Sequence, residues 1–162
     1  MLGDNADNQT DAARGRLNRA RAYCAGGERC RSAVRRKLQD WGATADEADD
    51  TVERLVEEGY IDDQRYARAY CESKMLRGGW GAKKVRYELQ IKHLAPADIA
   101  AGIAAVDEEE RRGALLREAE KKAASLRGTD SDTMRRRLMA FLLQRGFETE
   151  EINNIIKQIN TL

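Results

Sequence analysis

Several residue groups in this 162-residue sequence have types and spacings that could support chemistry. Adjacent carboxylates can share acid–base work, a glycine-rich loop can cradle phosphate, a histidine can act as a general base, and clustered cysteines can bind a metal. The residues concerned are Asp62 and Asp63, the run Gly78-Gly79-Trp80-Gly81, the single histidine His93, and the cysteines Cys24, Cys30 and Cys71.

A structural role explains each of the first three groups better than catalysis. Asp62 and Asp63 stand just before a predicted helix, where carboxylates cap free N–H groups. The glycine run joins two predicted helices and follows no strand, which predicts a flexible turn in place of a phosphate loop. His93 lies near a predicted helix C-terminus, where a cap or a packed ring is expected.

The cysteines form no CxxC pair, and with one histidine they do not make a zinc site. Their odd number, together with a polar, acidic start that does not resemble a signal peptide, predicts reduced thiols in a cytoplasmic protein. We expect each to be a small buried apolar residue. The sequence also lacks the P-loop, GxGxxG, GxSxG and HExxH motifs, so we expect no enzyme activity, no cofactor and no metal.

Composition favours an all-α protein. Apolar residues make up 41% of the chain, aromatic residues 6% and charged residues 35%, and there is one proline. A core must therefore be built from aliphatic residues, and little in the chain breaks helices. No apolar run approaches the roughly 18 residues of a membrane span, so no membrane partner is expected.

Apolar residues recur at helical spacing and repeat with a period near 50 residues, which predicts tandem helical units. Leu38 and Leu89 are 51 residues apart, and Leu89 and Leu142 are 53 apart. Four sets of positions match between the units: Val34, Val85 and Leu138; Leu38, Leu89 and Leu142; Ala48, Ile99 and Ile152; Val52, Ile103 and Ile156.

Helix start and stop signals agree with this repeat. Thr44 and Glu47 form a predicted capping box, Pro96 stands in a first turn, and glycines follow several stripes. We therefore predict three tandem three-helix repeats in an elongated, curved array, because units this small must stack on their neighbours. The predicted boundaries are a disordered N-terminal tail at 1–13 and repeats at 14–60, 61–107 and 108–162.

Charge is segregated although the formal net charge is only +1. Five basic residues and no acid lie between Arg29 and Lys37, six and one between Lys74 and Lys92, and four and none between Arg135 and Arg145. Each run lies on or leads into the second helix of a unit. The third helix of the first unit instead carries seven acidic residues and one arginine between residues 46 and 58.

Two interpretations of this pattern remain open. Neighbouring helices could neutralise one another across solvent, which is the usual state of charged helix faces. Alternatively, the basic second helices could form a stripe that attracts nucleic acid or an acidic protein surface. Because such helices also resemble helix-turn-helix units, a DNA-binding protein without an obligatory protein partner is an alternative function. A scaffold for an unrelated protein is a third.

The central motif resembles the RecX family of regulatory proteins. An acidic pair and an Arg-aromatic-Ala step (Asp62-Asp63-Gln64-Arg65-Tyr66-Ala67) are followed by the glycine run and by a basic helix that contains Glu88-Leu89. The resemblance covers about residues 17–160. One departure is His93-Leu94, which stands where the family often has a Lys-Gly pair, so the second helix of this unit must end without a glycine.

The resemblance implies tandem three-helix repeats and a non-enzymatic regulator that binds the RecA filament on single-stranded DNA. Such proteins block strand exchange and co-protease activity, and some bind DNA weakly. We expect a monomer with the RecA nucleoprotein filament as partner and only weak binding to single- or double-stranded DNA. The contact residues we predict are the cations Arg35, Arg36, Lys37, Lys83, Lys84, Arg86, Arg135, Arg136 and Arg137. The structural motif residues are Asp62, Asp63, Tyr66, Ala67 and Leu89.

Overall fold

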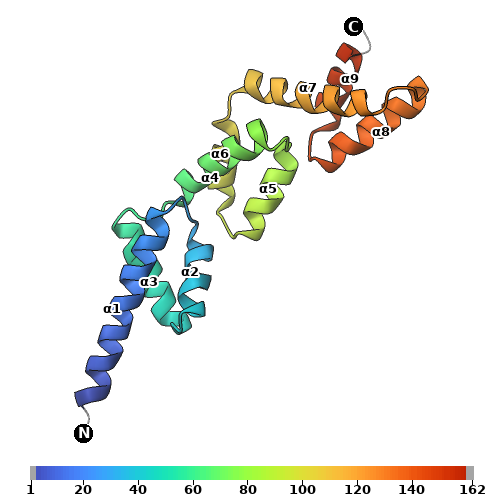
Figure 1. The fold of residues 1–162 in the computed structure, drawn as a ribbon. Helices are drawn as coiled ribbons and strands as arrows, with labels where there is room; N and C mark the ends of the chain where they lie inside the picture. Colours follow the sequence, from blue (N-terminus) through green and yellow to red (C-terminus); the bar gives the residue numbers. More distant parts are fainter. Residues whose placement is uncertain (1–2, 160–162) are drawn as a thin grey trace. The chain divides into compact units, whose positions relative to one another are not determined.

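The computed structural model describes residues 3–159, with side-chain surroundings from residue 9 onward. This range is all-α, as predicted (Figure 1). No helix in it is both long and apolar enough to cross a bilayer. The elements are α1 (Gly3–Ala25), α2 (Arg31–Asp40), α3 (Ala45–Glu57), α4 (Asp63–Glu72), the π-helix η1 (Ser73–Arg77), α5 (Ala82–Ile91), α6 (Pro96–Ala104), α7 (Glu108–Ser125), α8 (Ser131–Gln144) and α9 (Thr149–Ile159).

The predicted repeat is confirmed in the helix order and in the core. α1–α3, α4–α6 (with η1) and α7–α9 each form a three-helix repeat. All twelve residues of the four matched sets are buried, with exposed fractions between 0% and 7%. The same positions therefore build the core of each repeat, as expected when one amphipathic pattern is used three times.

Contacts divide the chain into two compact units. The first unit holds the residues up to Tyr66 together with Lys92–Leu94, and the second holds Ala67–Ile91 and the residues from Ala95 onward. The core of the first unit is a cluster formed by α1, α2, α3 and Ile61, over which Tyr23 and Trp41 meet edge to face at 6.1 Å. The predicted capping box opens α3, where Thr44 Oγ1 accepts from the Glu47 N–H and Glu47 Oε2 accepts from the Thr44 N–H.

The expected disordered tail at 1–13 is corrected by the start of α1 at Gly3. No proline lies between residues 3 and 25, so nothing breaks a helix that the buried Leu17 and Ala20 hold in the core. Ala12 and Ala13, both strong helix formers, carry it towards the N-terminus. Residues 1 and 2 lie outside the described range.

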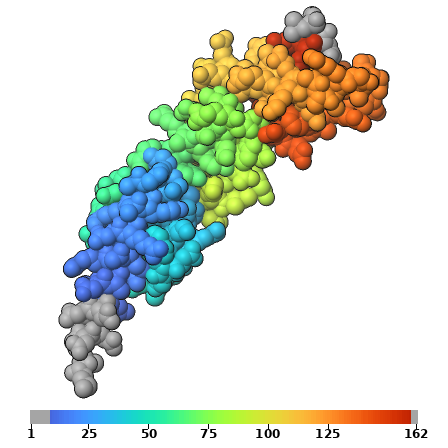
Figure 2. Space-filling view, viewed as in Figure 1, coloured from blue at the N-terminus to red at the C-terminus, as the bar shows by residue number. Residues whose placement is uncertain are grey.

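The second unit contains the rest of the second repeat and the whole third repeat. Ala67 of α4 is fully buried against α6, and a Cβ added to Gly102 would lie 3.1 Å from the Ala67 Cβ. Leu115, Leu142 and Ile152 belong to the core of the third repeat. Figure 2 shows the yellow-green atoms of the second repeat directly against the orange and red atoms of the third.

The second helices end in the same backbone conformation in all three repeats. Gly42 and Gly146 follow α2 and α8 with φ angles of 88° each. His93, at the equivalent position after α5, has φ 60° and is exposed. His93 therefore takes the left-handed conformation that glycine takes elsewhere, which costs a side chain with a Cβ about 1–2 kcal/mol. It is not the packed ring that was one expectation.

Candidate partner-binding surface

The nine cations predicted as contact residues divide into those held by the protein itself and those left to solvent. The internal partners are a carboxylate of the third helix, Glu148 just before α9, neighbouring aromatic rings and a hydroxyl in the first turn of α8. Within residues 9–159, a partner is found for Arg35, Lys37, Lys83, Lys84 and Arg136.

In the first repeat, α3 neutralises much of α2. Arg35 Nε donates to Asp49 Oδ1 at 2.5 Å and Arg31 Nη1 to Glu53 Oε1 at 2.8 Å. The hydrogen bond from Arg35 lowers the pKa of the Asp49 carboxyl. Lys37 lies 6.0 Å from the Tyr23 ring centroid. The neutralising interpretation of the charge pattern thus applies to this repeat.

The acidic third helix shows the same bonding from its other side. Glu58, directly after α3, accepts from Arg21 Nη2 at 2.7 Å and from Arg54 Nε at 3.0 Å. The hydrogen bond from Arg21, with that from Arg54, lowers the pKa of Glu58 to about 2 against the opposing effect of desolvation. Four of the seven acidic residues between 46 and 58 are therefore ion-paired inside the first unit: Glu47, Asp49, Glu53 and Glu58.

In the second repeat, two of the three predicted cations have partners within the second unit. Lys83 Nζ lies 2.8 Å from Glu148 Oε2, and Lys84 Nζ lies 4.3 Å from the Trp80 ring centroid, on the side chain that Lys74 also approaches at 4.9 Å. Arg86 is exposed and has no ion-pair or hydrogen-bond partner in the described part of the chain. It is the cation of α5 that remains available to a partner.

In the third repeat, α8 keeps its arginines in solvent. Arg136 Nη2 donates to the Thr133 hydroxyl at 3.1 Å. Arg135 and Arg137 are exposed, and neither has a carboxylate partner among the described residues. With Arg36 of α2, which is likewise exposed and unpaired within residues 9–159, four of the nine predicted cations remain free: Arg36, Arg86, Arg135 and Arg137.

The glycine run is a junction between the second and third repeats, which the prediction of a flexible turn missed. The Gly81 N–H donates to the Arg145 carbonyl at 2.8 Å, and the Lys83 N–H donates to the Gly146 carbonyl at 3.1 Å. The C-terminus of α8 thus satisfies two of the free N–H groups at the N-terminus of α5. A Cβ at Gly81 would lie 2.3 Å from the Gly146 carbonyl, so only glycine fits.

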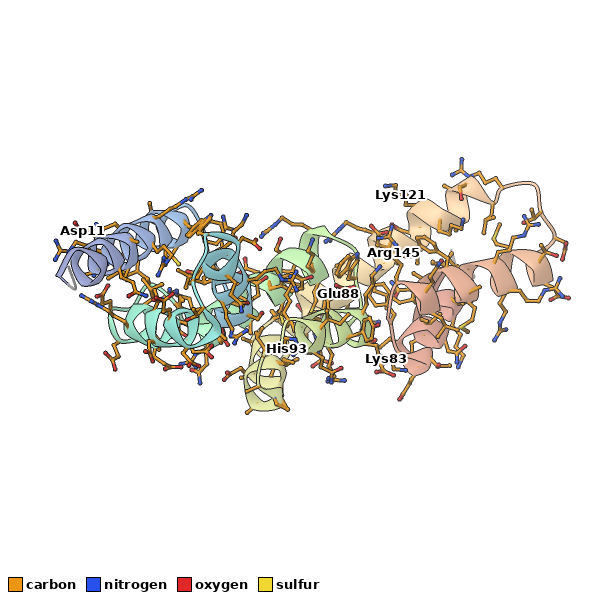
Figure 3. All side chains as sticks on the ribbon, turned by 90° about the horizontal axis from the view of Figure 1, so that it is seen from below. Asp11, Lys83, Glu88, His93, Lys121 and Arg145 are labelled. Atoms are coloured by element: carbon orange, nitrogen blue, oxygen red, sulfur yellow. The ribbon has the colours of Figure 1, made fainter. Side chains whose placement is uncertain are left out.

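Side chains reinforce this junction. Arg145 Nη1 donates to the Gly78 carbonyl at 3.2 Å, and its Nη2 lies 3.6 Å from Glu118 Oε2. Figure 3 labels the two residues that flank this junction, Lys83 in the second repeat and Arg145 in the third. The sequence signal for this junction was the presence of glycine at two helix ends, Gly81 before α5 and Gly146 after α8. The length of the glycine run was not the signal.

The acidic pair caps two different helices. Asp62 Oδ1 accepts from the Arg65 N–H at 3.0 Å and so caps α4, as predicted. Asp63 Oδ1 accepts from the Arg31 N–H at 3.0 Å at the start of α2. Arg65 in turn reaches Glu28 Oε1 at 2.6 Å. The motif therefore fastens the start of α4 to the turn before α2 within the first unit.

The remaining motif residues are packing residues. Leu89 is fully buried and Tyr66 half-buried. The three cysteines are free and buried, as predicted, and burial raises the pKa of the Cys71 thiol to about 11. No group of three or more potential metal ligands occurs in the described part of the chain.

Three family models match the chain in the order of its repeats. They are the first, second and third three-helix domains of RecX, and they match residues 17–55, 62–103 and 108–156. The chain is 32% identical over 164 residues to the regulatory protein RecX of Trichlorobacter lovleyi, which covers 98% of this chain and 100% of the relative.

The relatives differ in length. The regulatory protein RecX of Clostridium botulinum strain Eklund 17B is 31% identical over 127 residues, and the match spans 77% of this chain but 59% of that relative. The solved structure of RecX from Lactobacillus salivarius has the same fold, with a TM-score of 0.84 at 21% identity over 94% of this chain and 99% of that one. The chain therefore belongs to the RecX family of regulatory proteins.

Proposed function

We propose that this chain binds the RecA nucleoprotein filament on single-stranded DNA and inhibits strand exchange and co-protease activity. It acts as a monomeric, cytoplasmic binding protein without catalysis. The observation that carries the proposal is the set of free arginines on the second helices, with at least one in each repeat. Three linked repeats that each present a cation suit a partner that is itself a repeating, negatively charged polymer.

The free arginines define the proposed contact more narrowly than the nine predicted cations. Reversing Lys83 would also break its ion pair with Glu148 at the repeat junction, and reversing Lys84 would remove its contact with Trp80. If such a variant bound the filament more weakly, the cause could be either a disturbed fold or a lost contact with the partner. Arg86, Arg135 and Arg137 have no such internal role among the described residues and make cleaner probes.

The test compares two double variants within the third repeat. Arg135→Glu/Arg137→Glu removes the free cations of α8, and Lys121→Glu/Arg127→Glu makes the same charge change on α7 and in the turn after it, at exposed residues (Figure 3 labels Lys121). We expect the α8 variant to bind RecA–DNA filaments at least tenfold more weakly, because both cations contribute and reversal adds repulsion. The α7 variant should bind within twofold of the parent. Equal binding by all three proteins would contradict the proposal.

The same measurement separates the alternative, a DNA-binding protein without an obligatory partner. A filament regulator binds DNA-loaded RecA much more tightly than DNA alone or free RecA. A DNA-binding protein binds DNA equally well without RecA, with an affinity that falls steeply as salt rises. The titrations should therefore include filament, free RecA and bare single-stranded DNA at two salt concentrations.

A further inference from the structure

The second helix of the second repeat exposes an apolar pair. Three large apolar side chains among the described residues are markedly exposed: Tyr87 at 61%, Ile91 at 54% and Leu143 at 43%. Tyr87 and Ile91 both lie on α5, four residues apart, so they stand on one face of that helix. Leu143 lies by itself on α8, where a lone exposed leucine is ordinary.

The repeat architecture does not require this pair. The repeat register places Arg36 and Asp40 of α2, and Ala140 and Gln144 of α8, at the positions equivalent to Tyr87 and Ile91. The other two repeats thus build the same helix with polar or small residues at these places. Because both side chains are more than half exposed, the pair on adjacent turns of one helix face indicates a contact surface.

The neighbours of the pair favour a protein over nucleic acid as its partner. A stacking site for bases is normally lined by several cations that hold the phosphates. On α5, Lys83 is paired with Glu148 and Lys84 lies on Trp80, which leaves Arg86 as the free cation of that helix. Two apolar anchors one turn apart, with an arginine beside them, instead match a helix that enters an apolar groove on a protein.

We propose that the α5 face formed by Tyr87 and Ile91, with Arg86 at its edge, docks into an apolar groove with an acidic rim on a protein partner. This inference rests on the proposed function, in which that partner is the RecA subunit of the filament. Tyr87 and Ile91 supply the desolvated centre of the contact, and Arg86 pairs with a carboxylate at its margin.

The experiment measures the Kd of the full chain for preassembled RecA–DNA filaments and, separately, for bare single-stranded DNA. Tyr87→Ala and Ile91→Ala should each weaken filament binding about tenfold, the size expected for a central contact. Tyr87→Phe, which keeps the ring, should stay within twofold. Leu143→Ala is the matched control, an exposed apolar residue of the same unit, and should bind like the parent. Thermal melts confirm that the variants fold, which is expected because these side chains are exposed.

Each outcome has a distinct meaning. Parent protein that fails to bind the filament overturns the proposed function and this inference with it. Parent that binds while Tyr87→Ala and Ile91→Ala bind equally well overturns the docking face and leaves the proposed function standing. A tenfold loss in Tyr87→Ala that appears equally with bare DNA overturns the protein partner in favour of base stacking. A loss as large in Leu143→Ala shows unspecific apolar binding and also overturns the inference.

Discussion

The first and third repeats have the same three-helix fold but differ in whether the arginines of the second helix are paired with carboxylates. Val34 and Leu38 of α2 are fully buried, as are their equivalents on α8 to within 2%. The arginines of α2 that face α3 are held by carboxylates, whereas Arg135 of α8 has no carboxylate partner in the described range. A basic run in the sequence therefore does not by itself predict a basic surface.

The third helix of each repeat decides this difference. Arg31 and Arg135 occupy equivalent positions on α2 and α8. The partner of Arg31 is Glu53 of α3, and the repeat register places Lys157 of α9 where Glu53 stands. An ammonium group in that place cannot neutralise an arginine. The second repeat follows the same rule, since Arg86 is equivalent to Arg35 but Ala100 replaces its carboxylate partner.

Substitutions in the two cores should have the largest effects on stability and test whether the first and third repeats unfold independently. Leu38→Ala and Leu142→Ala each empty a fully buried site and should each lower the free energy of unfolding by about 2–5 kcal/mol. Because the two residues lie in separate clusters in different units, each change should raise hydrogen exchange mainly in the helices of its own unit. Exchange measured by mass spectrometry checks this. Equal deprotection of both units by either variant would show a single cooperative unit instead.

The next largest effect concerns the glycines after α2 and α8. Gly42 and Gly146 share a φ of 88°, but a Cβ at Gly42 meets nothing within 4 Å while one at Gly146 lies 2.5 Å from the Lys84 backbone nitrogen. Gly42→Ala should cost about 1–2 kcal/mol from backbone strain alone. Gly146→Ala should cost about 1–3 kcal/mol more, because it also forces the repeat junction apart. Chemical denaturation of both variants measures the difference, and equal losses would show that the junction contributes nothing.

A smaller effect is expected from moving the carboxylate of the first repeat into the third. Lys157→Glu places an acid opposite Arg135 and should weaken filament binding about two- to fivefold, since an exposed ion pair is worth up to about 1 kcal/mol. Lys157→Gln controls for the loss of the lysine itself. The reciprocal change Glu53→Lys frees Arg31 and should strengthen binding slightly. Stronger filament binding by Lys157→Glu, or weaker filament binding by Glu53→Lys, would contradict a contact made by the second helices.

Much of the fold was predictable because burial follows apolar spacing. The twelve matched positions, the capping box and the cap by Asp62 all depend on residues close in sequence. The junction at Gly81 was not predictable in the same way, because the groups it joins, the Gly81 N–H and the Arg145 carbonyl, are far apart in the chain. The cap by Asp63 on α2 was missed for the same reason.

The candidate site was predictable only in outline. Runs of arginine and lysine located the second helices, but which cations are free depends on the third helix packed against each run. Once the structure shows that Arg31 pairs with Glu53, the repeat register places Lys157 where Glu53 stands and so predicts that Arg135 lacks this carboxylate partner. Comparing charge across the register, as well as along the chain, therefore reduces the nine cations to a shorter set.

The smallest expected difference between the first and third repeats is in how their stability depends on pH in acid. The arginine bonds of the first repeat lower the pKa of Glu58 from its ordinary 4.5 to about 2 and lower that of Asp49 as well. A carboxyl whose pKa is lower in the folded state stabilises the fold above its ordinary pKa, and this contribution is lost as pH falls through the folded value. In the third repeat, the hydrogen bond from the Thr133 N–H lowers the pKa of the Asp130 carboxyl, which caps α8.

Acidification from pH 5 to pH 2 should therefore destabilise the first unit progressively through these bonds, and Glu58→Gln should flatten that dependence. Asp130→Asn, which keeps a capping side chain, should flatten the dependence of the second unit instead. Hydrogen exchange along a pH series, corrected for the intrinsic rate, resolves the two units. An unchanged slope in Glu58→Gln would mean that the pKa of Glu58 is the same in the folded and the unfolded chain, and that its bonds to Arg21 and Arg54 do not stabilise the first unit.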